Sequence, residues 1–229
     1  MDSFSVWFAR RRVGPDGEFE FYAIHGTQFP DSSIQGVDWD QPPIEAGSVV
    51  YRALYRADGH PLAVKVMSYG AKSEVRLWYV SCPEPDARPP AHTLIAFSTP
   101  DFSDGVFVEP GALEALGIDK DQQVGAFRWW PESGQAHQVY VAPMWRRRGL
   151  ASKIVLAASG FGLGWGLPRL WGIGQLTDLG AAWTGSAIWH SRVPTWTERL
   201  PPMTPPEDTA DVPRRNLLPD DSGEPEPIP

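Results

Sequence analysis

Alternation of apolar and polar residues predicts a β-rich first half of the chain. Residues 4–26 hold two aromatic and β-branched runs on either side of Gly-Pro-Asp-Gly, a strong hairpin turn signal. A second hairpin is predicted over residues 48–70, turning at Ala-Asp-Gly-His, and further strands over residues 74–82 and 92–99. A proline- and acid-bearing loop, residues 38–47, interrupts this half.

The pattern after residue 104 mixes strands with helices. A short helix is predicted over residues 110–118, and a third hairpin over residues 123–143, turning at Pro-Glu-Ser-Gly. Apolar residues from Leu150 to Ala158 then recur on one helical face, and Gly160 is expected to end that helix. A short buried strand over residues 167–174 and a helix over residues 176–190 follow. We find no internal repeat in the sequence.

These elements predict an α+β fold. Residues 1–104 form its β-rich N-terminal half, which could be the substrate side of the same domain, and residues 105–199 form the core. Residues 200–229 contain nine prolines and almost no apolar periodicity. Such a segment cannot bury enough surface to offset its ordering entropy, so we expect a disordered tail.

Composition narrows the class of protein. The hydrophobic content of 42% supports a buried core, and no run approaches the roughly 20 apolar residues of a membrane span. The order of charges at the start does not fit a signal peptide, so the expected compartment is the cytoplasm. A single cysteine, Cys82, excludes an internal disulfide. The net charge of −8 disfavours a protein that holds duplex nucleic acid by its overall field.

The junction at residues 141–152 carries the candidate chemistry. A strand that enters a turn and then a helix presents unpaired N–H groups and a helix dipole that favour an anion. Arg146, Arg147 and Arg148 occupy this junction, and Gly149 permits close approach of a diphosphate. The alternative is an ordinary solvated helix start. Exposed cations at a helix start are unfavourable by roughly 0.3–1 kcal/mol each, so three arginines there favour a site that binds an anion.

The stretch Val-Tyr-Val-Ala-Pro-Met-Trp-Arg-Arg-Arg-Gly-Leu-Ala-Ser resembles motif A of the GNAT acetyltransferase superfamily. That signature is [Q/R]-x-x-G-x-[G/A] after a strand ending in V-x-P, and residues 146–151 together with Val141 and Pro143 supply it. The resemblance covers roughly residues 105–190. It implies a GNAT-like fold, with a mixed, mostly antiparallel central sheet flanked by helices. It also implies acetyl-CoA as the cosubstrate of residues 105–199.

The resemblance also implies a set of cofactor-binding residues. The amides of Arg147 to Ser152, including those of Gly149, Leu150 and Ala151, would bind the pyrophosphate, with Arg146 beside them. The strand backbone around Tyr140 and Val141 would separate from its neighbour, often at a β-bulge, and bind the pantetheine arm and the acetyl carbonyl. Such an amide would also stabilise the oxyanion of a tetrahedral intermediate. No metal is implied.

An acceptor amine with a pKa near 10.4 needs a base to remove its proton. On a regular strand His137 would lie on the same side as Val139 and Val141, and its residue type suits general-base work. Glu132 in the preceding turn is the next candidate. Family members commonly protonate the thiolate with a tyrosine on a later helix, but no tyrosine follows Tyr140, which leaves His190 as the candidate acid. Each of these residues could instead be a surface or structural group.

The favoured hypothesis is an N-acetyltransferase acting on a primary amine, most simply in a small molecule. A modified nucleobase amine in DNA is another acceptor. A second hypothesis is a catalytically degenerate acyl-CoA-binding protein of the same fold, and a third is a nucleic-acid interaction module that uses the two arginine runs. A membrane partner is not expected, and a homodimer is possible.

Overall fold

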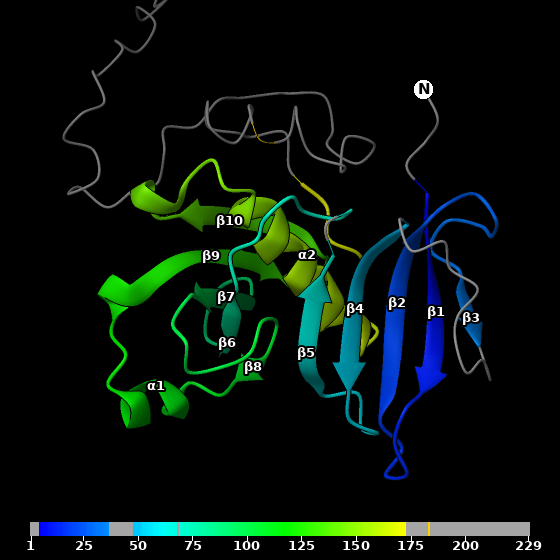
Figure 1. Ribbon diagram of the computed structural model, residues 1–229, viewed down its shortest axis with the longest axis horizontal. Coiled ribbons are helices and arrows are strands. Elements are labelled where there is room, and N and C mark those ends of the chain that lie inside the picture. Colours follow the sequence, from blue (N-terminus) through cyan, green and yellow to red (C-terminus); the bar gives the residue numbers. More distant parts are fainter. Residues whose placement is uncertain (1–4, 37–47, 68, 173–182, 184–229) are drawn as a thin grey trace, which may run out of the picture.

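The computed structural model describes residues 5–36, 48–67, 69–172 and 183, which form an α+β fold of two mostly antiparallel sheets around one long helix (Figure 1). The five-stranded sheets have the orders β3-β1-β2-β4-β5 and β10-β9-β7-β6-β8. The first sheet contains β1 (Val6–Arg12), β2 (Phe19–His25), β3 (Ile34–Gly36), β4 (Val49–Tyr55) and β5 (Pro61–Val66). The second contains β6 (Trp78–Glu84), β7 (Ala91–Phe97), β8 (Phe107–Val108), β9 (Gln123–Trp130) and β10 (Gln135–Val141). The helices are α1 (Gly111–Leu116), α2 (Leu150–Leu163) and the 3-10 turns Lys120–Gln122 and Pro143–Trp145.

The three predicted hairpins and the short helix α1 are confirmed. The mixed, mostly antiparallel character is also confirmed, but the single central sheet is replaced by two. Among the described residues, backbone pairing joins the sheets where β5 approaches the loop before β8, through the bridge between Ala63 and Val106 and a 2.8 Å bond from Val64 N to Gly105 O. Elsewhere α2 lies between them, so one continuous sheet cannot form.

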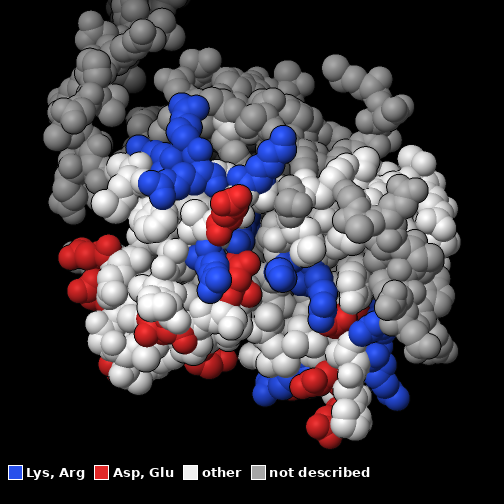
Figure 2. Space-filling view, viewed as in Figure 1, with Lys and Arg blue, Asp and Glu red and all other residues white. Residues whose placement is uncertain are grey.

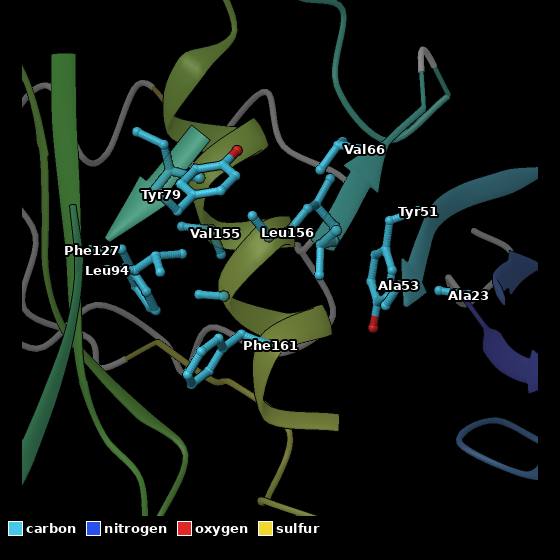
Figure 3. Close-up of a cluster of buried hydrophobic side chains, with 14 of the residues drawn as sticks. Ala23, Tyr51, Ala53, Val66, Tyr79, Leu94, Phe127, Val155, Leu156 and Phe161 are labelled. Atoms are coloured by element: carbon cyan, nitrogen blue, oxygen red, sulfur yellow. The ribbon is translucent and has the colours of Figure 1, made fainter. Parts of the chain in front are cut away.

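Helix α2 is the centre of the core and is buried on nearly every side (Figure 3). Val155, Leu156 and Phe161 reach side chains of both sheets, including Leu94 and Val66. The prediction of a single apolar face was therefore wrong, as was the expected end at Gly160. A Cβ on Gly160 would lie 2.8 Å from both methyl groups of Val64, so this glycine allows α2 to pack closely on β5.

The two sheets are built from the same unit, which occurs twice. Residues 5–67 and 76–142 each begin with an antiparallel hairpin, β1–β2 or β6–β7. A short strand then pairs in parallel with the first strand, as β3 with β1 and β8 with β6. A second hairpin, β4–β5 or β9–β10, completes each sheet in the same antiparallel order. The expectation of no internal repeat was wrong, and the predicted division at residue 105 falls inside the second unit.

Matching side-chain contacts support the repeat. Trp7 packs edge-on against Phe29 with ring centroids 4.7 Å apart, and Trp78 packs against Phe102 at 4.9 Å, both at 62°. Two aspartates make the same strand-start bond: Val6 N donates to Asp31 Oδ1 at 2.9 Å, and Leu77 N donates to Asp104 Oδ1 at 2.8 Å.

Both units also contain a bulge at the same place. The last strand has one unpaired residue, Leu62 in β5 and His137 in β10. The offset between equivalent residues grows from 78 − 7 = 71 at the tryptophans to 137 − 62 = 75 at the bulges. A repeat without a fixed period is difficult to find in a sequence.

Some predicted segments lie outside the described residues. These are the loop at 38–47, the C-terminal tail at 200–229 and, apart from Trp183, the helix at 176–190. Of the strand predicted at 167–174, Trp171 forms a parallel bridge with Gln135.

Candidate functional site: the junction between β10 and α2

The chain turns sharply between β10 and α2. After the 3-10 turn Pro143–Trp145 the backbone is extended at Arg146, with φ −65° and ψ 159°. Arg147 and Gly149 then have positive φ angles of 63° and 73°, and α2 begins at Leu150. Neither helix nor strand is continuous through this segment, which we call the arginine loop (residues 146–149).

The arginine loop presents backbone N–H groups without acceptors. Arg146 N donates to Pro143 O at 3.3 Å, and Lys153 N donates to Gly149 O at 3.1 Å. Between them, the amides of residues 147–152 have no hydrogen-bond acceptor among the residues that the structure describes. Together with the first-turn dipole of α2, these amides favour an anion.

The three arginine side chains take different positions. Arg146 Nε donates to Val141 O at 3.0 Å, which ties the loop to the end of β10. The guanidinium of Arg148 lies 5.1 Å from the ring centroid of Trp145, and the side chain of Arg147 is exposed. Figure 2 shows Lys and Arg side chains gathered over the segment between β10 and α2. An anion at the amides would therefore lie beside two exposed guanidinium groups.

Gly149 is required by both its backbone angle and its surroundings. A Cβ there would lie 2.8 Å from Lys72 O, so the arginine loop packs directly on the backbone that follows β5. The side chain of Lys72 is itself exposed. A large residue at 149 would displace this backbone as well as block an anion, which makes Gly149 unsuitable for a clean test of binding.

The first turn of α2 is anchored from inside by a buried ion pair. Lys153, which is 3% exposed, donates from Nζ to Asp104 Oδ1 and to Val75 O, both at 2.7 Å. Because Asp104 also accepts from Leu77 N, one carboxylate joins α2 to the start of β6. No signal in the sequence indicates this anchor, since a lysine in the first helical turn normally belongs to a solvated face.

The outer edge of β10 pairs with Trp171 near the beginning of the strand. Trp171 N donates to Gly134 O at 2.9 Å, and Ala136 N donates to Trp171 O at 2.8 Å. Farther along, the register pairs Tyr140 with Ala126 of β9, and Val141 is the last residue of the strand. The strand predicted at residues 167–174 thus lies beside the first part of β10, and its residues 173 and 174 lie outside the described residues.

His137 occupies the bulge in β10, and the bulge changes the side to which it belongs. Ala136, Val139 and Val141 pack on the core, whereas His137 contacts Arg128 and Trp130 on the opposite face of the sheet. The expectation that His137 shares a side with Val139 and Val141 was wrong, because the extra residue shifts the alternation.

The contact with Arg128 also limits the chemistry of His137. Arg128 Nη1 lies 3.2 Å from His137 Nδ1, and because a guanidinium only donates, Nδ1 is the acceptor. The neutral ring then carries its proton on Nε2. Burial and, after it, the charge of Arg128 lower the pKa of His137, which keeps the ring neutral. Arg128 is in turn held by Glu84, and this hydrogen bond lowers the pKa of the Glu84 carboxyl.

The other two predicted catalytic residues are not brought to the junction by the described structure. Glu132 is exposed in the turn between β9 and β10, at the opposite end of β10 from the arginine loop. His190 lies outside the described residues. Their proposed roles stay predictions.

The chain matches no protein-family model, no curated protein and no solved structure. Among the described residues, no helix is long and apolar enough to cross a membrane. In the same part of the chain, no three His, Cys, Asp or Glu side chains are grouped so that they could hold a metal ion.

Proposed function

We propose that the protein binds acetyl-CoA at the arginine loop and transfers the acetyl group to a primary amine. The observation that supports binding is the run of six amides at residues 147–152 without an acceptor in the described part of the chain, flanked by the guanidinium groups of Arg147 and Arg148. A diphosphate provides acceptors for such amides and opposite charge for the arginines. The proposal of acetyl-CoA in particular rests on the resemblance of residues 105–190 to the GNAT superfamily.

The proposed path of the cofactor runs from the arginine loop along β10. By the resemblance, the backbone around Tyr140 and Val141 would bind the pantetheine arm, and an amide there would stabilise the oxyanion. Arg146 already occupies Val141 O, so that carbonyl would remain a protein contact. His137 would serve as base only after Arg128 releases Nδ1.

A second candidate function is binding of acyl-CoA without transfer. The specific observation in its favour is the orientation of His137, which faces away from α2 and has its acceptor nitrogen engaged by Arg128. The bulge at His137 adds no support for transfer, because β5 carries the same bulge at Leu62.

Two measurements test these proposals separately. Isothermal titration of CoA into the full chain tests binding, and release of free thiol from acetyl-CoA across a panel of amines tests transfer. Saturable binding with thiol release supports the transferase, and binding without release for any amine supports the second candidate. Absence of binding contradicts both.

A further inference from the structure

The two sheets face each other along two seams that the repeat makes equivalent. In the first seam, β5 lies against the loop before β8, where Val64 N donates to Gly105 O at 2.8 Å. The equivalent parts in the second seam are β10 and the Asp31 loop before β3. In the described part of the chain, these two have no strand pairing with each other.

Residues 167–171, which we call the strap, fill the second seam. On one side, Trp171 pairs with β10 through backbone bonds to Gly134 and Ala136, and its Nε1 donates to Ser133 O at 2.8 Å. On the other side, Arg169 Nη1 donates to the two carboxylate oxygens of Asp31 at 3.0 and 2.9 Å.

The ion pairs of the two seams differ in exposure. The Lys153 and Asp104 side chains of the first seam are 4% and 23% exposed, whereas those of Arg169 and Asp31 are 27% and 44% exposed. Exposed ion pairs contribute little to the free energy of unfolding, whereas loss of the partner of a buried cation lowers it strongly. We therefore expect the first seam to stay closed in the folded protein, and the second seam to be held more weakly.

A cavity lies behind the strap, between the two sheets. It is lined by Phe8 of β1, Tyr51 of β4, Trp129 of β9, Ser159 of α2 and Leu170 of the strap. Its volume of about 20 Å³ holds one water molecule and no organic ligand. Leu170 is only 7% exposed and closes this space from the strap side.

We propose that the strap opens at the second seam, and that the space left by Leu170 is a binding site for a small uncharged aromatic or aliphatic ligand. The aromatic rings of Phe8, Tyr51 and Trp129 provide apolar walls from both sheets, and Ser159 provides a hydroxyl. Such walls with few polar groups are typical of small-molecule sites. This site is separate from the arginine loop and does not depend on acetyl transfer.

Two reversible disulfide locks test the proposal in the full chain, in a Cys82→Ser background. Gln135→Cys with Trp171→Cys locks the strap to β10, and Ala63→Cys with Val106→Cys locks the first seam as the matched control. Both pairs face each other across a β-bridge, which places their Cα atoms within disulfide range. The ligand probe is toluene, a single neutral ring, and its binding is followed by isothermal titration calorimetry. Amide hydrogen exchange at Ala136 and Trp171 reports the second seam, and exchange at Val64 reports the first.

We expect the amides of Ala136 and Trp171 to exchange about tenfold or more faster than that of Val64, as in sub-global opening of a weakly held segment. Toluene should bind the unlocked protein, both reduced variants and the oxidised control, and it should not bind the oxidised strap lock. Toluene binding that survives the oxidised strap lock, or no binding to the unlocked protein, would overturn the site. Exchange at Ala136 and Trp171 as slow as at Val64 would overturn the opening.

Discussion

The two units share strand order, bulge position and strand-start aspartate, yet they differ in the segment after the last strand. After β5 the chain passes through residues 67–75 directly into the second unit. After β10 it forms the arginine loop and α2, the helix that both sheets use as their core. The shared features therefore belong to the fold of each unit. The segment that only the second unit has, the arginine loop and α2, is the better candidate for a functional site.

Comparison of the two units shows that the bulge in β10 and the amides of the arginine loop do not support acyl transfer equally. The bulge at His137 recurs at Leu62, where β5 lies against the protein itself, so the bulge is a property of the unit. The amide run of residues 147–152 differs from the described residues after β5, where Gly70 and Ala71 both donate to Met67 O. The arginine loop consequently carries more weight than the strand in the proposed function.

The largest expected effect contrasts the two equivalent aspartates. Asp104→Ala leaves Lys153 as an unpaired buried cation and should lower the free energy of unfolding by about 3–5 kcal/mol. Asp31→Ala removes a more exposed pair and one bond to Val6 N, and should cost about 1–2 kcal/mol. Urea unfolding of the two variants measures the difference. Equal losses would show that the two seams are held alike.

The next effect concerns His92, which occupies the position of Phe19 in the first unit. His92 stacks on Trp129 at 4.7 Å as Phe19 stacks on Tyr55 at 5.2 Å, and burial lowers its pKa to about 4. Between pH 6.5 and 4 the unfolded chain binds a proton that the folded protein does not. The free energy of unfolding should therefore fall by about 3 kcal/mol as the pH is lowered through this window.

His92→Phe should remove that part of the acid sensitivity. Urea unfolding of wild type and variant between pH 7 and pH 4 gives the comparison, and the difference between the two slopes isolates His92 from other groups. His137→Leu serves as a control with a smaller change, because the pKa of His137 is also lowered but the ring is less buried. Identical slopes for wild type and His92→Phe would contradict the assignment.

The smallest effect on stability is expected from the bulge. His137→Leu places the first unit's residue, Leu62, at the equivalent position, and should change the free energy of unfolding by less than about 1 kcal/mol. CoA affinity should stay unchanged, whereas thiol release should fall about 100-fold if His137 accepts the proton. Undiminished release from an active wild type would remove His137 from the mechanism.

Local signals were sufficient for much of the fold. Turn residues such as Gly17, Gly59 and Gly134 have positive φ angles, and their hairpins were predicted because glycine in these turns is recognisable in sequence. The start of α2 at Leu150 was predicted from the helical spacing of apolar residues between Leu150 and Ala158. The bend and the loop of the candidate site could therefore be predicted from the sequence alone.

The remaining features depend on contacts between distant residues. Gly160 is typical of a helix end, but it continues α2 because Val64 packs against it. Lys153 is typical of a solvated helix face, but it is buried by its bond to Asp104. The bulge that turns His137 away from the core leaves no mark in the alternation of residues 135–141. The division into two sheets and the repeat were missed for the same reason, because strand order depends on pairing between residues that are far apart in the sequence.

The most direct test of the proposed function is calorimetric titration of CoA against two variants with the same change in net charge. Arg147→Glu with Arg148→Glu alters the arginine loop, and Arg12→Glu with Lys65→Glu alters exposed side chains of the first unit. We predict saturable binding to wild type and to the control pair, with affinity reduced about 100-fold or more by the loop pair. Equal affinity in all three proteins, or no binding to wild type, would contradict the proposed anion site.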